Sequence, residues 1–149
     1  MKKIISLNTN GLRSAISKGF REWIKAHPYD LVCIQETKMD ESHADPDYFA
    51  PESYHSYWHC AKKKGYSGVL ILSKHKPNKI RTGFGIPEID REGRMILLDF
   101  DHFSICNCYF PSGSASEERH AFKMKFLDAV YPLFMDMVHE KKNLIVVGD

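Results

Sequence analysis

Three polar side chains, Asn8, Glu36 and Asp149, each stand at the end of a run of apolar residues. Such runs are typical of buried strands, and ligands gather beyond the carboxyl ends of strands in sheets that are covered by helices. We therefore expect the three side chains to converge. Two carboxylates and one amide oxygen form a set of hard ligands, which suits Mg²⁺ or Mn²⁺ and is poor for zinc. Taken singly, each residue could instead cap a helix or form a turn.

The apolar runs before these residues predict three strands, at residues 4–7, 31–34 and 144–147. Between the first two strands, residues from Leu12 to about His27 carry apolar side chains at helical spacing, and Pro28 closes this predicted helix. The first two strands would then position Asn8 and Glu36.

The middle of the chain differs, because short strand candidates follow one another without a long helix. Between Tyr54 and Tyr109 the candidates are residues 55–61, 68–73, 79–83, 94–100 and 103–109, separated by turn residues. This pattern favours a run of antiparallel hairpins.

A further helix is predicted after the loop of residues 111–114. Ser116 can cap this helix, and Glu117 and Glu118 suit its positive end. Pro132 predicts a kink. The buried face of the helix would contain Phe122, Phe126, Ala129, Leu133 and Met137.

Strands mixed with flanking helices predict an α/β or α+β sandwich built on a mixed sheet. One globular core is the default for 149 residues of which 43% are hydrophobic. The apolar strand at residues 144–147 should be covered on both faces, yet no further layer follows it. We therefore expect residues 1–149 to be the N-terminal portion of a single larger domain that continues past Asp149.

The composition argues against a membrane-spanning protein. No apolar run approaches the roughly 18 residues that a membrane helix needs. The apolar stretch near the N-terminus is too short for a signal peptide. The cysteines are Cys33, Cys60, Cys106 and Cys108, without any C-x-x-C pair, and three of them lie in apolar runs. We expect buried free thiols and a cytoplasmic protein.

Positive charge is gathered in two places, although the formal net charge is only +2. Residues 62–64 are three lysines beside Tyr66, and a second basic group lies within residues 74–81. These groups could follow a phosphate backbone, or they could be solvated turns.

Six short motifs occur in order along the chain. They are Asn8 to Arg13 (NTNGLR), Gln35 to Lys38 (QETK), Gly65 to Val69 (GYSGV), Arg91 to Arg94 (REGR), Tyr109 to Pro111 (YFP) and Gly148-Asp149. The series resembles the exonuclease III and apurinic/apyrimidinic endonuclease family, within the DNase I-like phosphoesterase superfamily. The resemblance implies half of a four-layer sandwich, with two mixed sheets face to face and helices outside. It also implies Mg²⁺-dependent cleavage of double-stranded DNA beside abasic sites, often with 3′ exonuclease or 3′ phosphatase activity.

The same resemblance implies roles for individual residues. Glu36 would be the magnesium ligand, and Asn8 would help to hold the metal and the neighbouring catalytic groups. Tyr109 would contact the scissile phosphate, although a tyrosine at a strand end can also be a half-buried core residue. Asp149, also in the predicted metal set, would orient or deprotonate the attacking water. The residues expected to face DNA are Asn10, Arg13 and Tyr66.

The chain also departs from the family pattern. Family members carry an Asn two positions after the Gly-Asp aspartate and an Asp-His pair near their C-terminus, and neither feature is present. Residues 111–114 read PSGS, where many relatives carry an amide side chain after the proline. Single catalytic groups contribute roughly 10² to 10⁴ in rate, so we expect little or no turnover from these 149 residues alone.

Two other functions stay open. A non-catalytic DNA-binding or assembly module would bind the DNA backbone through its lysines. Its exposed sheet would pair with another chain, by self-association or with a complementing C-terminal half. A phosphoesterase acting on a phospholipid or inositol phosphate would keep the metal chemistry, but the GYSG and EGR motifs are closer to the DNA-repair branch.

Overall fold

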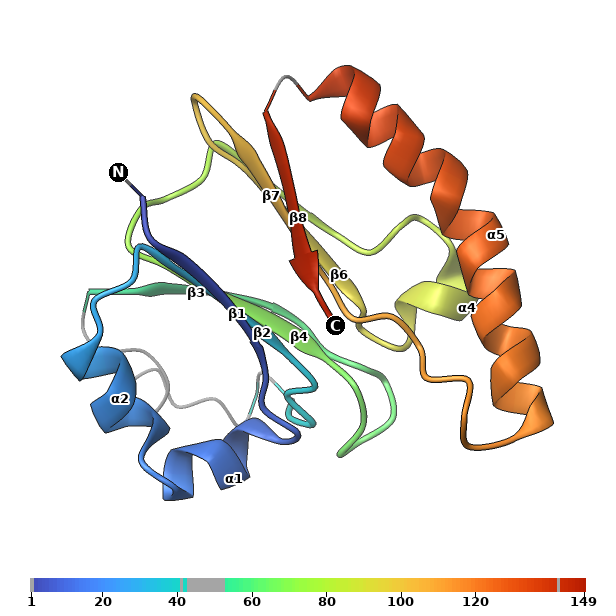
Figure 1. Cartoon of the computed structure of the whole chain (residues 1–149), viewed down its shortest axis with the longest axis horizontal. Coiled ribbons are helices and arrows are strands. Elements are labelled where there is room, and N and C mark those ends of the chain that lie inside the picture. Colours follow the sequence, from blue (N-terminus) through green and yellow to red (C-terminus); the bar gives the residue numbers. More distant parts are fainter. Residues whose placement is uncertain (1, 41, 43–52, 142) are drawn as a thin grey trace.

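The computed structural model describes residues 2–40, 42, 53–141 and 143–149. Two four-stranded sheets pack face to face, and helices cover their outer faces. Figure 1 shows the four layers, which run from α1 and α2 through both sheets to α4 and α5. Each sheet contains parallel and antiparallel neighbours. The predicted sandwich of mixed sheets flanked by helices is confirmed.

The first sheet carries the segments that lead to Asn8 and Glu36. Its strands, in spatial order, are β1 (Ile4–Asn8), β2 (Leu31–Gln35), β4 (Val69–Ser73) and β3 (His55–His59). β1 and β2 are parallel, and the other neighbours are antiparallel. All residues of β2 and β4 are buried, because these strands lie between the helical layer and the second sheet.

The single helix predicted from Leu12 to about His27 is wrong. The segment forms two helices, α1 (Leu12–Ser17) and α2 (Phe20–Ala26). They are separated at Gly19, whose φ of 95° is a left-handed conformation that glycine adopts at little steric cost. Because the chain turns there, Leu12 of α1 and Ile24 of α2 both reach the core under the first sheet.

The second sheet carries the segments that lead to Tyr109 and Asp149. Its strands, in spatial order, are β5 (Lys79–Thr82), β6 (Met95–Asp99), β7 (Ser104–Cys108) and β8 (Leu144–Gly148). The expected hairpins are present between β3 and β4 and along β5, β6 and β7, but the chain crosses from one sheet to the other between β4 and β5. The outer face is covered by α4 (Pro87–Asp90) and α5 (Glu117–Glu140).

The long helix α5 begins as predicted. The Ser116 hydroxyl accepts a hydrogen bond from the backbone N–H of Arg119 at 3.1 Å, which caps the first turn. The helix is continuous across Pro132. Of the predicted buried face, Phe126 and Met137 are buried, whereas Phe122, Ala129 and Leu133 are half-buried.

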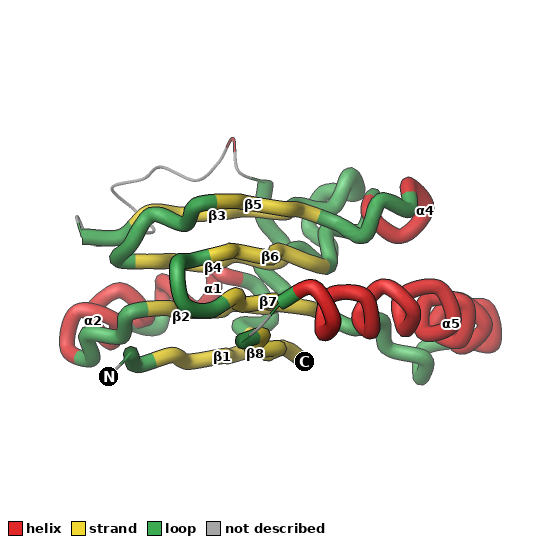
Figure 2. Tube along the Cα trace, turned by 90° about the horizontal axis from the view of Figure 1, so that it is seen from above, coloured by secondary structure: helices red, strands yellow, loops and turns green. Residues whose placement is uncertain are grey.

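The strand predicted at residues 144–147 is present, and within the described residues it is only partly covered. β8 is an edge strand of the second sheet, and its Ile145 and Val146 side chains are 38% and 48% exposed. β1 is an edge strand of the first sheet. Figure 2 shows β1 and β8 next to each other, so the two open edges lie on the same side of the sandwich.

A buried polar contact joins the two sheets just below the end of β2. The Gln35 amide nitrogen donates to the Asn107 side-chain oxygen at 2.6 Å. The Asn107 amide nitrogen in turn donates to the backbone oxygens of Ile34 and Leu70, at 3.0 and 3.1 Å. Apolar side chains from both sheets surround this contact, so a buried hydrogen-bonded pair links β2 to β7 within the core.

The cysteines behave largely as expected. Cys33, Cys106 and Cys108 are buried, and burial raises the pKa of Cys33 and of Cys106 to about 12. All four cysteines lie in the described part of the chain, and none forms a disulfide. Within the described residues, no helix is long and apolar enough to cross a bilayer.

Candidate functional site

The structure brings the three predicted strand ends together. The Asn8 amide nitrogen donates hydrogen bonds to Glu36 Oε2 at 2.9 Å and to Asp149 Oδ2 at 2.7 Å. Tyr109 lies beside them, since its hydroxyl and the Glu36 carboxylate influence each other's pKa. Four strands from two sheets therefore end at one cluster of one amide, two carboxylates and one phenol.

Parallel pairing places Asn8 beside Glu36. β1 and β2 run in register, with Asn8 opposite Gln35, so the residue after β2 emerges next to Asn8. The pairing extends past the strands, because the N–H of Gly11 donates to the backbone oxygen of Glu36 at 2.8 Å. Glu36 has a φ of 57°, which is uncommon for a residue with a side chain and which turns the backbone out of the strand direction.

The second sheet repeats this arrangement with Tyr109 and Asp149. β7 and β8 are parallel, with Cys108 opposite Gly148. The N–H of Phe110 donates to the backbone oxygen of Asp149 at 2.8 Å, so the pairing continues beyond β8. A Cβ atom at Gly148 would lie 1.8 Å from the Cys108 oxygen, so only glycine fits directly before Asp149.

One lysine pairs with one of the two carboxylates of the cluster. Burial acts to raise the pKa of Glu36, but hydrogen bonds from Lys38 and Asn8 outweigh it and leave this pKa below its usual value. Lys38 Nζ lies 2.9 Å from Glu36 Oε1. Burial, together with the nearby Glu36 carboxylate, raises the pKa of Tyr109 to about 12. The phenol therefore stays protonated at neutral pH and can donate a hydrogen bond.

The donor set fits a sparsely coordinated hard cation. Glu36 and Asp149 supply two carboxylates, and Mg²⁺ commonly binds through one or two carboxylates while it keeps several waters. Asn8 presents its amide nitrogen to both carboxylates, whereas its oxygen accepts from the N–H of Asn10 at 2.7 Å. In this arrangement Asn8 orients the carboxylates. Within the described ranges, no group of three or more His, Cys, Asp and Glu side chains is placed to hold a metal.

The residues expected to face DNA lie around this cluster. The Asn10 side-chain oxygen accepts from Lys38 Nζ at 2.6 Å. Arg13 is exposed and lines a hollow of about 440 Å³ together with Lys38. Tyr66 lies on the other flank, where its hydroxyl accepts hydrogen bonds from two arginines and Lys63 lies 5.4 Å from its ring centre.

Sequence reasoning missed the two arginines that contact Tyr66. Arg94 and Arg119 both pair with Glu92. Arg94 also donates to the backbone oxygen of Tyr109. The signal available was the REGR motif, which contains Glu92 and Arg94, but no sequence pattern connects it with Arg119.

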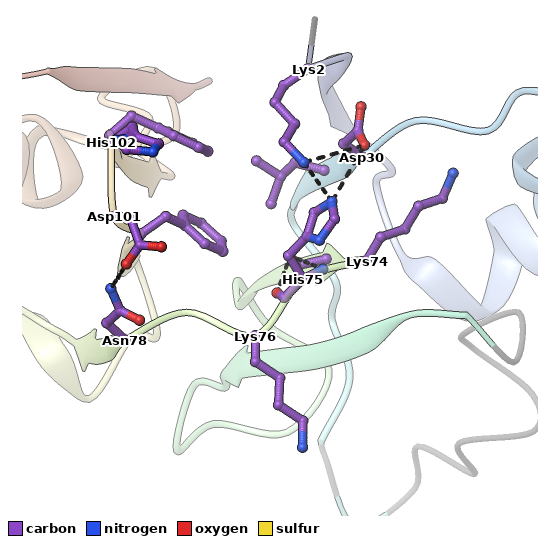
Figure 3. Close-up of a pocket in the computed structure, with 12 residues that line it drawn as sticks. Lys2, Asp30, Lys74, His75, Lys76, Asn78, Asp101 and His102 are labelled. Carbon is purple, nitrogen blue, oxygen red and sulfur yellow. Dashed lines mark hydrogen bonds and ion pairs between the residues drawn. The ribbon is translucent and has the colours of Figure 1, made fainter.

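A cavity of about 590 Å³ lies at the opposite end of the sandwich. It is lined in part by Leu31 and Ser73, which pair with each other at the end of β2 away from Gln35. Figure 3 shows Lys2 and His75 directed toward Asp30. Lys2 Nζ lies 3.9 Å from Asp30 Oδ1, and His75 Nε2 lies 3.7 Å from the same oxygen. Lys74 and Lys76 also line this cavity, so this part of the second basic group lies away from the strand-end cluster.

Comparison with known proteins agrees with the geometry of the site. The family model described as Endonuclease/Exonuclease/phosphatase family matches residues 5–149. The chain is 37% identical over 148 residues to the exodeoxyribonuclease of Bacillus subtilis (strain 168), a match that covers 99% of this chain and 57% of that protein. It is also 37% identical over 148 residues to the DNA-(apurinic or apyrimidinic site) endonuclease of Dictyostelium discoideum, covering 99% of this chain and 41% of that protein.

A solved structure gives the same result. The AP endonuclease from Archaeoglobus fulgidus aligns with a TM-score of 0.85 at 27% identity, over 100% of this chain and 57% of that chain. The resemblance to exonuclease III and AP endonucleases is thus confirmed, and the chain spans about half the length of the curated relatives it matches. Over residues 5–149, the chain belongs to the endonuclease/exonuclease/phosphatase family.

Proposed function

We propose that this chain is part of an Mg²⁺-dependent DNA-repair phosphodiesterase that cleaves double-stranded DNA beside abasic sites and acts on 3′ ends. The observation that carries the proposal is the contact of Asn8 with both Glu36 and Asp149 beside Tyr109. The named activities of its relatives, an exodeoxyribonuclease and AP endonucleases, support the same substrate class.

Each residue of the cluster has a chemical role in this proposal. Glu36 and Asp149 would hold Mg²⁺, and Asn8 would fix the distance between them. The bound ion would neutralise charge that develops on the phosphate oxygens and the leaving group. The Tyr109 hydroxyl, which stays protonated, would donate a hydrogen bond to a phosphate oxygen. Asp149 would also orient or deprotonate the attacking water.

The flanks of the cluster would contact the DNA backbone. Asn10 and Arg13 lie on one flank, and Tyr66 with Lys63 lies on the other, so a duplex placed across the cluster would meet positive side chains on both sides. Contacts between lysine or arginine and phosphates supply affinity without reading the sequence.

We expect the 149 residues alone to nick an abasic-site duplex only weakly, because the relatives are roughly twice as long and the chain lacks the Asp-His pair that the resemblance implies. The measurement is nicking of a labelled abasic duplex with Mg²⁺ and with EDTA, with an intact duplex as control. Robust Mg²⁺-dependent nicking by the chain alone would contradict this expectation.

A binding assay, combined with the nicking assay, separates the enzyme from a non-catalytic DNA-binding module. DNA binding, followed by fluorescence anisotropy, should respond to Mg²⁺ if the ion bridges the carboxylates and a phosphate. Affinity that is identical in Mg²⁺ and EDTA, with no turnover under any condition, would favour the module and count against the nuclease.

We further propose that the edges of β1 and β8 bind an additional polypeptide segment. Each edge strand offers unpaired backbone N–H and C=O groups on its outer side, and such edges are templates for pairing. Ile145 and Val146 add exposed apolar surface at the same place. The match covers 57% of the Bacillus subtilis relative, and we propose that the occupant corresponds to the remaining part of such proteins.

Co-expression with the unmatched C-terminal part of the Bacillus subtilis exodeoxyribonuclease tests this surface. We expect the two pieces to purify together and to nick abasic DNA with Mg²⁺. Val146→Lys should weaken the complex, because it places a charge on the apolar edge. Val138→Lys, at a 55% exposed position on α5, is the matched control and should have no effect. A chain that stays alone, or that only pairs with itself, would contradict the proposed occupant.

A further inference from the structure

A buried arginine lies directly behind the strand-end cluster. Arg94 precedes β6 and is only 2% exposed. An unpaired guanidinium at this depth would be costly, and Glu92 meets it with two contacts. Arg94 Nε donates to Glu92 Oε2 at 2.8 Å, and Arg94 Nη2 lies 2.7 Å from the same oxygen. The buried guanidinium of Arg94 is thus paired with a carboxylate.

The remaining side of the guanidinium is directed at Tyr109. Arg94 Nη1 donates to the backbone oxygen of Tyr109 at 2.9 Å, and its central carbon lies 5.0 Å from the centre of the Tyr109 ring. The main chains are also joined, because the N–H of Tyr109 donates to the backbone oxygen of Arg94 at 2.8 Å. Arg94 therefore contacts both the main chain and the ring face of Tyr109, while the hydroxyl of that ring lies near Glu36.

A second arginine holds the opposite side of Glu92. Arg119, in the first turns of α5, donates to Glu92 Oε1 at 3.0 Å and to Glu92 Oε2 at 3.2 Å. Arg119 and Arg94 also donate to the same Tyr66 hydroxyl, at 2.9 and 3.2 Å. The Glu92 carboxylate thus lies between two guanidinium groups, but of these two only Arg94 contacts Tyr109.

We infer that Arg94 is a positioning residue for Tyr109, which sets the distance of its hydroxyl from the two carboxylates. The inference rests on the proposed function, in which Tyr109 contacts the phosphate. A planar guanidinium makes its ion pair, its carbonyl contact and its ring contact at once, and a lysine ammonium cannot do so. Misplacement of a reacting group by about 1 Å can cost roughly 10²-fold in rate.

The test observes Tyr109 directly by ¹⁹F NMR of the chain labelled with 3-fluorotyrosine. The chain has seven tyrosines, and the Tyr109 signal is assigned by its loss in Tyr109→Phe. In Arg94→Lys we expect the Tyr109 signal to shift or split while the thermal unfolding curve remains cooperative. Arg119→Lys is the matched control, because Arg119 also pairs with Glu92 but is not in contact with Tyr109 in the described structure, and it should leave the signal in place.

Two outcomes would overturn the inference. One is a folded Arg94→Lys chain with an unchanged Tyr109 signal, and the other is an equal shift in Arg119→Lys. If Arg94→Lys does not fold, the wild-type chain is used instead, and absence of nuclear Overhauser contacts between the Arg94 guanidinium and the Tyr109 ring overturns it. The readout needs no turnover, so a shifted signal in a chain that gains no Mg²⁺-dependent nicking even with the complementing C-terminal part would reject the proposed function alone.

Discussion

Replacing Glu36 by glutamine is expected to weaken Mn²⁺ or Mg²⁺ binding to the chain by at least about 10- to 100-fold. Losing a residue that merely supports a metal ligand typically costs that much, and Glu36 is itself proposed as a ligand. The substitution keeps the shape of the side chain and removes its charge. It also leaves the Lys38 ammonium 2.9 Å away without its carboxylate partner, so a cation would face a positive charge.

Mn²⁺ titration followed by electron paramagnetic resonance measures this loss without any need for catalysis. Glu88→Gln is the matched control, because Glu88 is a half-exposed glutamate on α4 that pairs with Lys125 rather than with the cluster. We expect wild-type affinity in Glu88→Gln. Equal affinity in Glu36→Gln and wild type would show that the cation, if bound, is held elsewhere.

Replacing Phe126 by alanine is expected to lower the free energy of unfolding by about 3 to 5 kcal/mol, as for other buried phenylalanines. Phe126 is fully buried on α5. Its ring meets the rings of Phe84 and Phe110 edge to face, with centres 5.7 and 5.5 Å apart. Phe110 directly follows Tyr109, so this cluster of rings also supports the segment that carries the phenol.

Urea unfolding of the variant and the wild type measures the loss. The midpoints are compared after checking that the free energy of unfolding falls with urea at the same slope in both chains. Met124→Ala is the matched control on the same helix, since Met124 is 47% exposed and should change stability by less than about 0.5 kcal/mol. A Phe126→Ala chain as stable as wild type would mean that α5 does not pack on the second sheet as described.

The sequence was sufficient for the elements that depend on local pattern. The apolar runs at residues 31–34 and 69–72 became central strands, because a segment without polar side chains is stable only where both faces are covered. The cap at Ser116 was likewise readable, since capping needs only a hydroxyl at the first turn. The ordered motifs were sufficient to identify the family.

Local pattern failed where a single backbone angle or the position in a sheet decided the outcome. The apolar face of residues 12–27 continues in sequence, but the left-handed Gly19 divides it into two helices. The run at residues 144–147 is as apolar as a central strand, and only the structure shows that β8 has a neighbouring strand on one side alone. Strand type follows from composition, whereas the place of a strand in the sheet follows from its partners.

The candidate site shows the same division. The residue types and their positions after apolar runs were enough to name Asn8, Glu36 and Asp149 as a potential set. Only the tertiary structure decided that the Asn8 nitrogen, rather than its oxygen, faces both carboxylates, and that Arg94 contacts Tyr109. Asn8 and Asp149 are 141 positions apart and meet because β1 and β8 are neighbouring edges of two packed sheets. Contacts of this kind depend on how sheets pack, which no short stretch of sequence encodes.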